Sequence, residues 1–320
     1  MRKLVAVAVG SMLAVSVSAC GGGEEAASQS SDGLTSVNVG LIPTVDVAPL
    51  YLAQQQGLFE EHGLKVKFSE VQTGAAAMAA VMSNEYQFGF AAPAPEIQAR
   101  AKGLQITVVA GAISQGEALS QAIVVAPDSP VQDVTDLEGK TIAVNALQGI
   151  NDLVLRAVVK EAGGDHTKLN FIALPYPDMQ AALGSGQIDA AWLIEPFLVG
   201  AVEAGNRVIS KNPQGELSGP NTNFSSYFAA DKFVNENPET VQKFVDAVTE
   251  ANEYAEANPE AVRGVIPTFT AIKPEVAKKM AIGRFITKVD EPTFEVVGSY
   301  MKEFGWINEA PDLDALIYKP

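Results

Sequence analysis

Residues 37–71 read VNVGLIPTVDVAPLYLAQQQGLFEEHGLKVKFSEV. Val37–Ile42 is a short apolar run closed by a proline, which is typical of a buried strand. Asp46–Gln56 has the spacing of a helix and is followed by a glycine, and Leu64–Val71 alternates as a strand does. This stretch therefore predicts a strand, a helix and a second strand in succession.

The same alternation continues along the chain. Further strands are predicted over 88–92, 106–112, 121–126, 170–174, 190–194 and 207–210, and residues 136–144 begin the rhythm again. Helices are predicted over 74–83, 95–102, 151–163, 178–184 and 196–204, and then over 238–257, 259–267, 274–282 and 293–304. This order predicts an α/β fold with a parallel or mixed sheet flanked by helices, and a mainly helical C-terminal part.

The length of the body, from about residue 35 to Pro320, suits two lobes better than one compact core. We expect the chain to cross between them near residues 122–128 and to return near 220–228. The predicted division is 35–126 with 225–320 in lobe 1, and 127–224 in lobe 2.

The N-terminus has the layout of an export signal. Arg2 and Lys3 precede an apolar run that ends in Val17-Ser18-Ala19-Cys20, which resembles a bacterial lipoprotein box. We expect residues 1–19 to be removed, Cys20 to carry the lipid and residues 20–34 to form a flexible tether. The protein would then lie on the extracytoplasmic face, bound to the membrane through its lipid alone. The alternative is an ordinary signal peptide with an incidental cysteine.

Charge and composition exclude several functions. The net charge of −16 becomes −18 without Arg2 and Lys3, so nucleic-acid binding is not expected. His62 and His166 are the only histidines and Cys20 is the only cysteine, which disfavours soft-ligand metal sites and Ser-His-Asp catalysis. Phosphate-loop and dinucleotide motifs are missing as well, so we expect no metal, no cofactor and no enzyme activity. Chemistry by two carboxylates stays open.

Five motifs in order resemble the nitrate/sulfonate/taurine class of ABC-transporter solute-binding proteins, which has relatives that bind pyrimidine precursors of thiamine. They are residues 39–59 (VGLIPTVDVAPLYLAQQQGLF), 74–80 (GAAAMAA), 88–93 (FGFAAP), 136–145 (DLEGKTIAVN) and 189–197 (DAAWLIEPF). The resemblance implies a type II periplasmic-binding-protein fold with a hinged cleft. It also implies a small-molecule ligand and, as partners, an ABC permease with its ATPase; we expect a monomer. The alternatives are a sensor lipoprotein, or an enzyme of thiamine-precursor synthesis on the same fold.

Ligands of open α/β sheets lie beyond the carboxyl ends of the strands. The candidate loops are 43–46, 72–75, 92–95, 112–121, 145–151, 175–178 and 193–196. The predicted ligand-binding residues are Thr44, Asp46, Gln72, Gly74, Ala75, Pro93, Gln115, Asn145, Asn151, Tyr176, Asp178, Trp192, Glu195 and Phe224.

Several of these residues allow a purely structural interpretation. Gly74 and Ala75 could offer backbone N–H groups to an anion, or could merely let helices pack closely. Asn145 and Asn151 could hydrogen-bond a ligand, but Asn151 could equally cap a helix. The aromatic residues Tyr176, Trp192 and Phe224 could form ligand walls or belong to the core.

The candidate loops contain acidic residues and neither arginine nor lysine. Asp46, Glu117, Asp178 and Glu195 are the acids. This balance favours a ligand with a positive or donor-rich part, such as an amino-sulfonate, an amine-bearing acid or a pyrimidine-like heterocycle. The alternative is that Asp46 and Asp178 cap helices and that Glu195 is structural.

Overall fold

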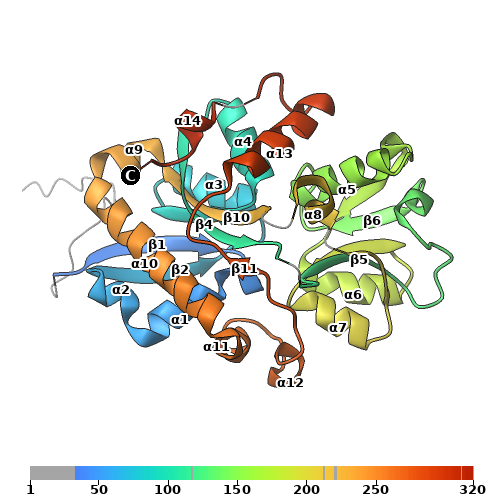
Figure 1. The fold of residues 1–320 in the computed structure, drawn as a ribbon, viewed down its shortest axis with the longest axis horizontal. Helices are drawn as coiled ribbons and strands as arrows, with labels where there is room; N and C mark the ends of the chain where they lie inside the picture. Colours follow the sequence, from blue (N-terminus) through green and yellow to red (C-terminus); the bar gives the residue numbers. More distant parts are fainter. Residues whose placement is uncertain (1–32, 117, 212, 220–221, 311, 320) are drawn as a thin grey trace, which may run out of the picture.

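The computed structural model describes residues 33–116, 118–211, 213–219, 222–310 and 312–319. The predicted signal segment, Cys20 and all but the last two residues of the predicted tether lie outside these ranges. The described residues form two α/β lobes, each built on its own sheet (Figure 1). The predicted α/β class with two lobes is confirmed.

The first sheet, sheet A, has the strand order β11-β4-β10-β3-β1-β2. β1 runs parallel to β2 and β3, whereas β10 is antiparallel to β3 and β4, and β11 is antiparallel to β4. The strands span Thr35–Leu41 (β1), Leu64–Glu70 (β2), Phe88–Ala91 (β3), Ile106–Ser114 (β4), Asn223–Ala230 (β10) and Arg284–Phe285 (β11). The sheet is therefore mixed, as the alternation of elements predicted.

The second sheet, sheet B, has the order β7-β6-β8-β5-β9. β6 is parallel to β7 and β8, and β5 is antiparallel to β8 and β9. The strands span Gln121–Val125 (β5), Thr141–Val144 (β6), Asn170–Ala173 (β7), Ala190–Ile194 (β8) and Arg207–Lys211 (β9). The predicted division gave β5 to lobe 1, but the strand pairs within sheet B. A fully buried strand carries no sequence mark of the lobe in which its partners lie.

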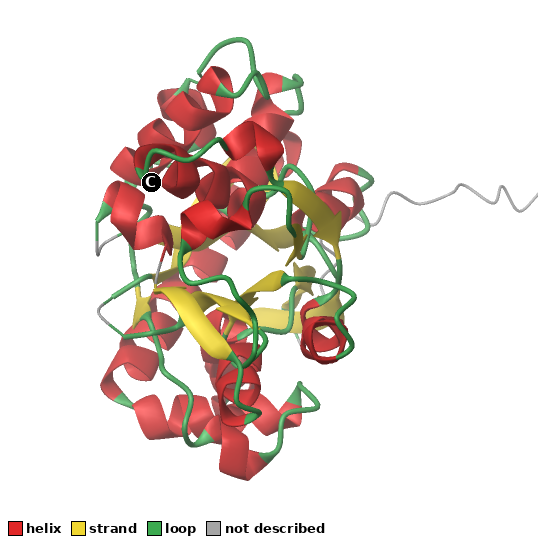
Figure 2. Ribbon diagram, turned by 90° about the vertical axis from the view of Figure 1, so that its right-hand side faces the viewer, coloured by secondary structure: helices red, strands yellow, loops and turns green. Residues whose placement is uncertain are grey.

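Helices lie on both sides of the strands (Figure 2). On the lobe of sheet A they are α1 (Ala48–Gln56), α2 (Leu58–Glu61), α3 (Gly74–Met82), α4 (Pro93–Ala101), α9 (Asp231–Glu236), α10 (Pro238–Ala257), α11 (Pro259–Val265), α12 (Pro274–Ala277), α13 (Glu291–Glu303) and α14 (Leu313–Leu316). On the lobe of sheet B they are α5 (Ile150–Glu161), α6 (Tyr176–Gly184), α7 (Phe197–Glu203) and α8 (Pro213–Ser218). Short 3₁₀ turns occupy Val45–Val47, Val134–Leu137, His166–Lys168 and Ile266–Thr268.

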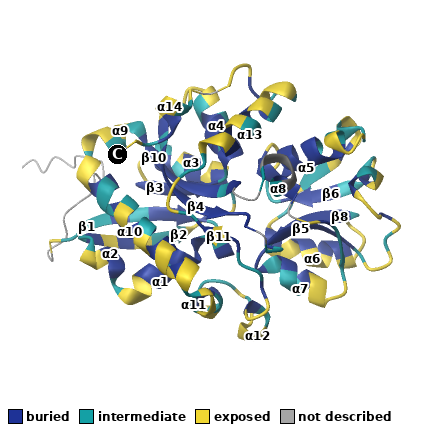
Figure 3. Cartoon of the chain, in the orientation of Figure 1, coloured by how far each residue is buried: buried dark blue, intermediate teal, exposed yellow. Residues whose placement is uncertain are grey.

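The apolar core follows from these layers. Alternate residues of β1, such as Val37 and Val39, are buried against α1 and α10 on one face of sheet A. The other face packs under α3, α4 and α13, and the same cluster continues through α5 to sheet B (Figure 3). A third cluster joins sheet B to α6 and α7. Because one cluster reaches both sheets, the lobes share apolar contacts beside the crossing segments.

Two segments carry the chain between the lobes. The first leaves sheet A at Ser114 and enters sheet B at Gln121, and the second leaves sheet B at Lys211 and rejoins sheet A at Asn223. The strand β10 that receives the return was not predicted as a strand. Ser225 and Ser226 interrupt its apolar pattern, and both are buried and hydrogen-bonded to carboxylates.

The C-terminal part contains α9, β11 and α14, which were not predicted, and one of its predicted helices is shorter than expected. A helix predicted over 274–282 ends at Ala277. Arg263 Nε donates to the carbonyl of Met280 at 3.2 Å, and the N–H of Ala281 donates to Glu195 Oε1 at 3.1 Å. Tertiary partners thus replace the helical hydrogen bonds of this segment. Across the described residues, no helix combines the length and the apolar character needed to cross a membrane.

Candidate functional site: a cavity between the lobes

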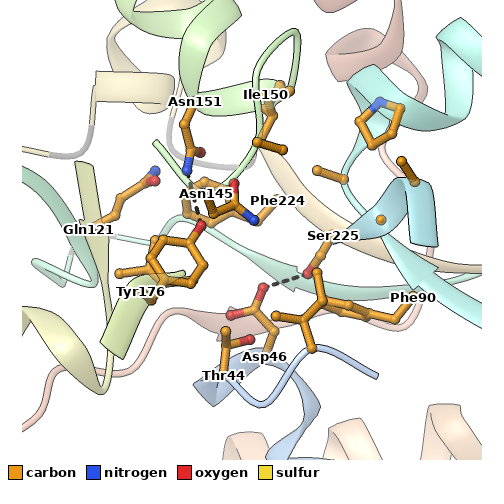
Figure 4. Close-up of a pocket in the computed structure, with 18 of the residues that line it drawn as sticks. Thr44, Asp46, Phe90, Gln121, Asn145, Ile150, Asn151, Tyr176, Phe224 and Ser225 are labelled. Carbon is orange, nitrogen blue, oxygen red and sulfur yellow. Dashed lines mark hydrogen bonds between the residues drawn. The ribbon is translucent and has the colours of Figure 1, made fainter. Parts of the chain in front are cut away.

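A cavity lies between the two lobes (Figure 4). Its walls come from the carboxyl ends of β1, β3, β6 and β8, from the first turns of α3, α4, α5 and α6, from Ser120 in the first crossing segment and from the start of β10. The centre of a water molecule can occupy about 120 Å³ of it, roughly ten times the space that one water needs. Its position agrees with the rule that α/β sheets bind ligands at strand ends.

Asp46 supplies the cavity's carboxylate. It lies in the turn after β1, and the hydroxyl of Ser225 donates to its Oδ2 at 2.7 Å. Withdrawal from water raises the pKa of Asp46 to about 6, although the Ser225 hydrogen bond opposes this rise. Among the described residues that line the cavity, Asp46 is the only Asp, Glu, Lys, Arg or His. The site therefore attracts hydrogen-bond donors and cations.

Aromatic and branched apolar side chains form much of the remaining wall. Phe90 comes from β3, Phe224 from β10 and Tyr176 from α6, and Ile113 and Ile150 add aliphatic surface. Tyr176 is buried, and its hydroxyl accepts from the Nδ2 of Asn151 at 3.0 Å. Rings on both lobes suit a flat solute that presents apolar faces.

Among the described residues, no hydrogen-bond partner of normal geometry meets two hydroxyl groups in the wall. Thr44 Oγ1 comes from the lobe of sheet A, and Ser120 Oγ comes from the crossing segment. Both residues are at least 95% buried. Buried hydroxyls normally find a partner. Thr44 also lies close enough to Asp46 to lower the pKa of that carboxyl, so its hydroxyl and that of Ser120 are placed to contact a solute that binds at Asp46.

Gln121 is a polar wall residue with a fixed orientation. The indole Nε1 of Trp192 donates to its Oε1 at 3.2 Å, and its Nε2 donates to Gln115 Oε1 at 2.9 Å. Gln115 Oε1 also accepts from the N–H of Gly215 at 3.1 Å. This network links Gln121 to both crossing segments. A solute that contacts Gln121 would therefore act on the segments that join the lobes.

Two helices begin at the cavity in different ways: the first turn of α3 is closely packed, and the first turn of α5 can contact a solute. At Gly74 a Cβ would lie 2.9 Å from Ala91 Cβ, so close packing explains this glycine. Thr73 Oγ1 accepts from the N–H of Ala76 and caps that helix. The start of α5 is different, because Gly149 provides no side-chain cap. Its first N–H groups can therefore face an electronegative part of a solute.

The structure brings eight of the predicted residues together at the cavity, and they come from both lobes. They are Thr44, Asp46, Gly74, Ala75, Asn145, Asn151, Tyr176 and Phe224. Asn151 does not cap α5, since its side chain donates to Tyr176. The turn before α5 is closed instead by Asp152 Oδ2, which accepts from the N–H of Gln148 at 2.9 Å.

Three other predicted residues, from the loop after β2 and from the first turns of α4 and α6, do not line the cavity. Gln72 is exposed and donates to Glu70 at 3.1 Å. Pro93 is buried in the first turn of α4. Asp178 is exposed in the first turn of α6, where an acidic side chain suits the helix dipole.

The last three predicted residues lie behind the cavity wall. Gln115 and Trp192 are buried and hold Gln121 from behind. Glu195 is 2% exposed, and its carboxylate accepts from the N–H groups of Val199 and Ala281. Burial raises the pKa of Glu195 to about 7, against the effect of these two hydrogen bonds. Glu195 therefore ties the end of β8 to the C-terminal segment.

Sequence reasoning missed Phe90, Gln121 and Ser225. Phe90 belongs to the FGFAAP motif but comes before the loop that was singled out. Gln121 is the last residue of the candidate loop 112–121, where Gln115 was chosen instead. Ser225 follows the predicted Phe224, and a pair of serines inside an apolar strand was the available signal.

Comparisons with known proteins agree with this geometry. Residues 44–262 match the family model described as NMT1/THI5 like. A Bacillus subtilis (strain 168) protein named for binding aliphatic sulfonates is 25% identical over 75% of this chain and 71% of its own length. The 4-amino-5-hydroxymethyl-2-methylpyrimidine phosphate synthase of Aspergillus parasiticus is 29% identical over 67% of this chain and 64% of its own.

The fold is shared with a solved binding protein. The periplasmic aliphatic sulphonate binding protein of Escherichia coli superposes with a TM-score of 0.72 at 19% identity, over 89% of this chain and 92% of that one. The predicted periplasmic-binding-protein fold and the resemblance read from the five motifs are both confirmed. This chain belongs to the NMT1/THI5-like family.

Proposed function

We propose that this protein is the extracytoplasmic solute-binding component of an ABC importer. It captures a small organic solute between its lobes and delivers it to a permease with its ATPase. The observation that carries the proposal is a cavity with walls on both lobes, with Asp46 on one side and Asn145 and Tyr176 on the other. A solute that contacts both sides favours the arrangement in which the lobes are closed around it.

The solute that the cavity fits best is a donor-bearing aromatic heterocycle of the aminopyrimidine kind. Its amino group would donate to Asp46, and its ring would lie among Phe90, Tyr176 and Phe224. Thr44 and Ser120 would meet its remaining polar atoms. A simple oxyanion would meet a carboxylate without a balancing arginine or lysine in the described wall, which is unfavourable in a partly dry site.

An amino acid or amino-sulfonate is the second candidate. The start of α5 lacks a side-chain cap and faces the cavity. An ammonium group could pair with Asp46 while a carboxylate or sulfonate accepts from the N–H groups of that helix. The acidic wall and the helix start would then each bind one end of a zwitterion.

The proposed mechanism has no chemical step. The Bacillus subtilis relative is named for binding, and this supports the proposal, while the Aspergillus synthase defines the enzyme alternative. A sensor that reports to a receptor is the other alternative. Permease and ATPase genes beside this one would favour transport over both.

We also propose where the protein is located in the cell and which segments allow the lobes to move. The protein would be held to the membrane by a lipid on Cys20 and would act as a monomer. The described residues that carry the chain between the sheets, 115–116, 118–120, 213–219 and 222, would form the hinge. Closure would then turn sheet B with its helices towards sheet A.

A ligand screen on the body from residue 33 onwards tests the proposal. The probes are 4-amino-5-hydroxymethyl-2-methylpyrimidine, taurine, ethanesulfonate and nitrate, followed by thermal unfolding and by mass spectrometry of the recovered probe. A bound probe at 100 times its Kd should add about 2.7 kcal/mol of stability. We expect the pyrimidine to stabilise the protein and to be recovered unchanged. A chemically altered probe would support the enzyme alternative, and failure of every organic probe would contradict the proposal.

A further inference from the structure

A second cavity lies between the lobes, beside the first. The centre of a water molecule can occupy about 460 Å³ of it. One wall comes from α6, β8 and α7, and the other from the ends of β1 and β2 and from the turn after the 3₁₀ segment Ile266–Thr268. Tyr176 lines both cavities and therefore forms part of the wall between them.

The walls of the second cavity are aromatic and nearly uncharged. The rings of Tyr176 and Phe197 lie parallel, with centroids 5.8 Å apart and an interplanar angle of 14°. Phe269 forms the opposite wall and is stacked on Tyr51 at 4.0 Å. Glu70 is the only charged side chain among the described lining residues. These walls suit an uncharged aromatic or alkyl group and repel anions.

Contacts between the lobes hold these walls in place. Glu195 accepts from the N–H of Ala281 at 3.1 Å through its side chain and from the N–H of Val45 at 3.3 Å through its carbonyl. Lys279 and Glu203 form an ion pair between the C-terminal segment and α7. In this arrangement of the lobes, hydrogen bonds and an ion pair therefore connect the two walls of the second cavity. We call this second cavity the compartment.

Gly200 is a lining residue of the compartment that can be substituted to test it. It lies within α7, where glycine is less favourable than alanine by about 1 kcal/mol. A Cβ at this position would meet only Gln180 Oε1, at 3.7 Å, so neither packing nor backbone conformation requires a glycine there. Any larger side chain would extend into the compartment, because Gly200 lines it.

We propose that this compartment is a second binding site, for an uncharged aromatic or alkyl group. The group is either a substituent of the captured solute, which reaches past Tyr176, or a separate small apolar molecule. The first source rests on the proposed function, whereas the second does not, because the compartment needs no contact with Asp46.

Fluorine NMR of 4-fluorobenzyl alcohol tests the site without any solute in the first cavity. Gly200→Leu fills the compartment, Gly200→Ala fills it partly, and Gly184→Leu is the matched control, since Gly184 is exposed on α6 with nothing within 4 Å of a Cβ. We expect wild type and Gly184→Leu to broaden the signal equally. Gly200→Leu should weaken binding at least fivefold, with Gly200→Ala between, while all melt cooperatively. Equal binding by all four proteins would overturn the proposal.

A second titration separates the two sources. It compares 4-aminopyrimidine with its N-benzyl derivative on wild type and on Gly200→Leu. If the benzyl group raises the affinity tenfold in wild type but not in Gly200→Leu, the group in the compartment is a substituent of the solute. If the benzyl group does not raise the affinity, and 4-fluorobenzyl alcohol still binds in the presence of 4-aminopyrimidine, the group belongs to a separate molecule. If wild type does not bind 4-aminopyrimidine, this result counts against the proposed function. The fluorine experiment still tests the second site, because it needs no solute in the first cavity.

Discussion

The hydroxyl of Ser225 lies 2.7 Å from the carboxylate of Asp46, although the two residues are 179 positions apart in the chain. Asp46 lies in the turn after the first strand of sheet A, and Ser225 lies where the chain has returned from sheet B. The acceptor of the proposed site is thus oriented by β10, the strand that follows the proposed hinge. The carboxylate of the cavity therefore lies close in the chain fold to a segment that we propose to move.

Binding should depend on pH through Asp46. Its pKa of about 6 lies above the ordinary value of 3.8 because the side chain is withdrawn from water. An amino group binds the ionised form, so affinity should rise with pH and level off above pH 7. For a probe that does not itself titrate between pH 5 and 8, affinity at pH 5 should be about tenfold below that at pH 7. Titration calorimetry measures this, and an equal decline in Asp46→Asn would refute the assignment.

The buried Glu96 should make the protein less stable as pH rises. It is fully buried, and the Ser226 hydroxyl lies 2.9 and 3.0 Å from its two oxygens. Burial raises the pKa of Glu96 well above its usual 4.5, with the Ser226 contact acting against this. The native state thus keeps a proton that the unfolded chain loses above about pH 4.5. Stability should fall by about 1.4 kcal/mol per pH unit between the two pKa values.

Glu96→Gln keeps the shape and removes that titration. Its stability relative to wild type should therefore increase from pH 5 to pH 8, as measured by urea unfolding. The exposed Glu253→Gln on α10 is the control and should show no such trend. A Glu96→Gln variant whose deficit grows with pH would show that the buried carboxyl is ionised in the native protein.

Glu195→Gln should loosen the lobes. The carboxylate satisfies two backbone N–H groups, those of Val199 and Ala281, and an amide oxygen can serve only one of the two positions. We expect a loss of about 1–3 kcal/mol in stability and a larger radius of gyration in ligand-free scattering. Lys279→Ala removes an exposed ion pair and should cost less than about 1 kcal/mol. An unchanged scattering profile for Glu195→Gln would argue against a tie between lobes.

The lipoprotein box makes a separate prediction. Cys20→Ser should yield folded protein that fractionates away from membranes, whereas the wild-type chain should incorporate labelled fatty acid. A mutant that remains membrane-bound, or a wild type without label, would refute lipid anchoring.

Much of the order of strands and helices could be predicted from periodicity, because the patterns of the strand predicted over Val37–Ile42 and of the helix predicted over Asp46–Gln56 are local. The neighbours of a strand within its sheet could not be predicted in this way. The apolar residues of β5 fit either sheet, and only tertiary pairing with β8 and β9 places the strand.

The candidate site could also be predicted only in part: topology places some of its residues, and tertiary contacts place the others. Residues at strand ends, such as Asp46 and Asn145, are placed by topology. Glu195 is also at a strand end, yet its side chain turns to Ala281, a residue 86 positions later. Gln121 faces the cavity because Trp192 and Gln115 hold its amide, and no local pattern encodes that network.

Isothermal titration of an aminopyrimidine into wild type, Asp46→Asn and Asp178→Asn tests the central claim most directly. Asp46 lies in the cavity wall and Asp178 is exposed outside it, so the two variants remove the same charge from different places. A charge-assisted hydrogen bond contributes about 1.5–3 kcal/mol. We predict a loss of at least about tenfold in affinity for Asp46→Asn and wild-type affinity for Asp178→Asn. Undiminished binding by Asp46→Asn, or tighter binding of ethanesulfonate than of the pyrimidine by wild type, would contradict the account.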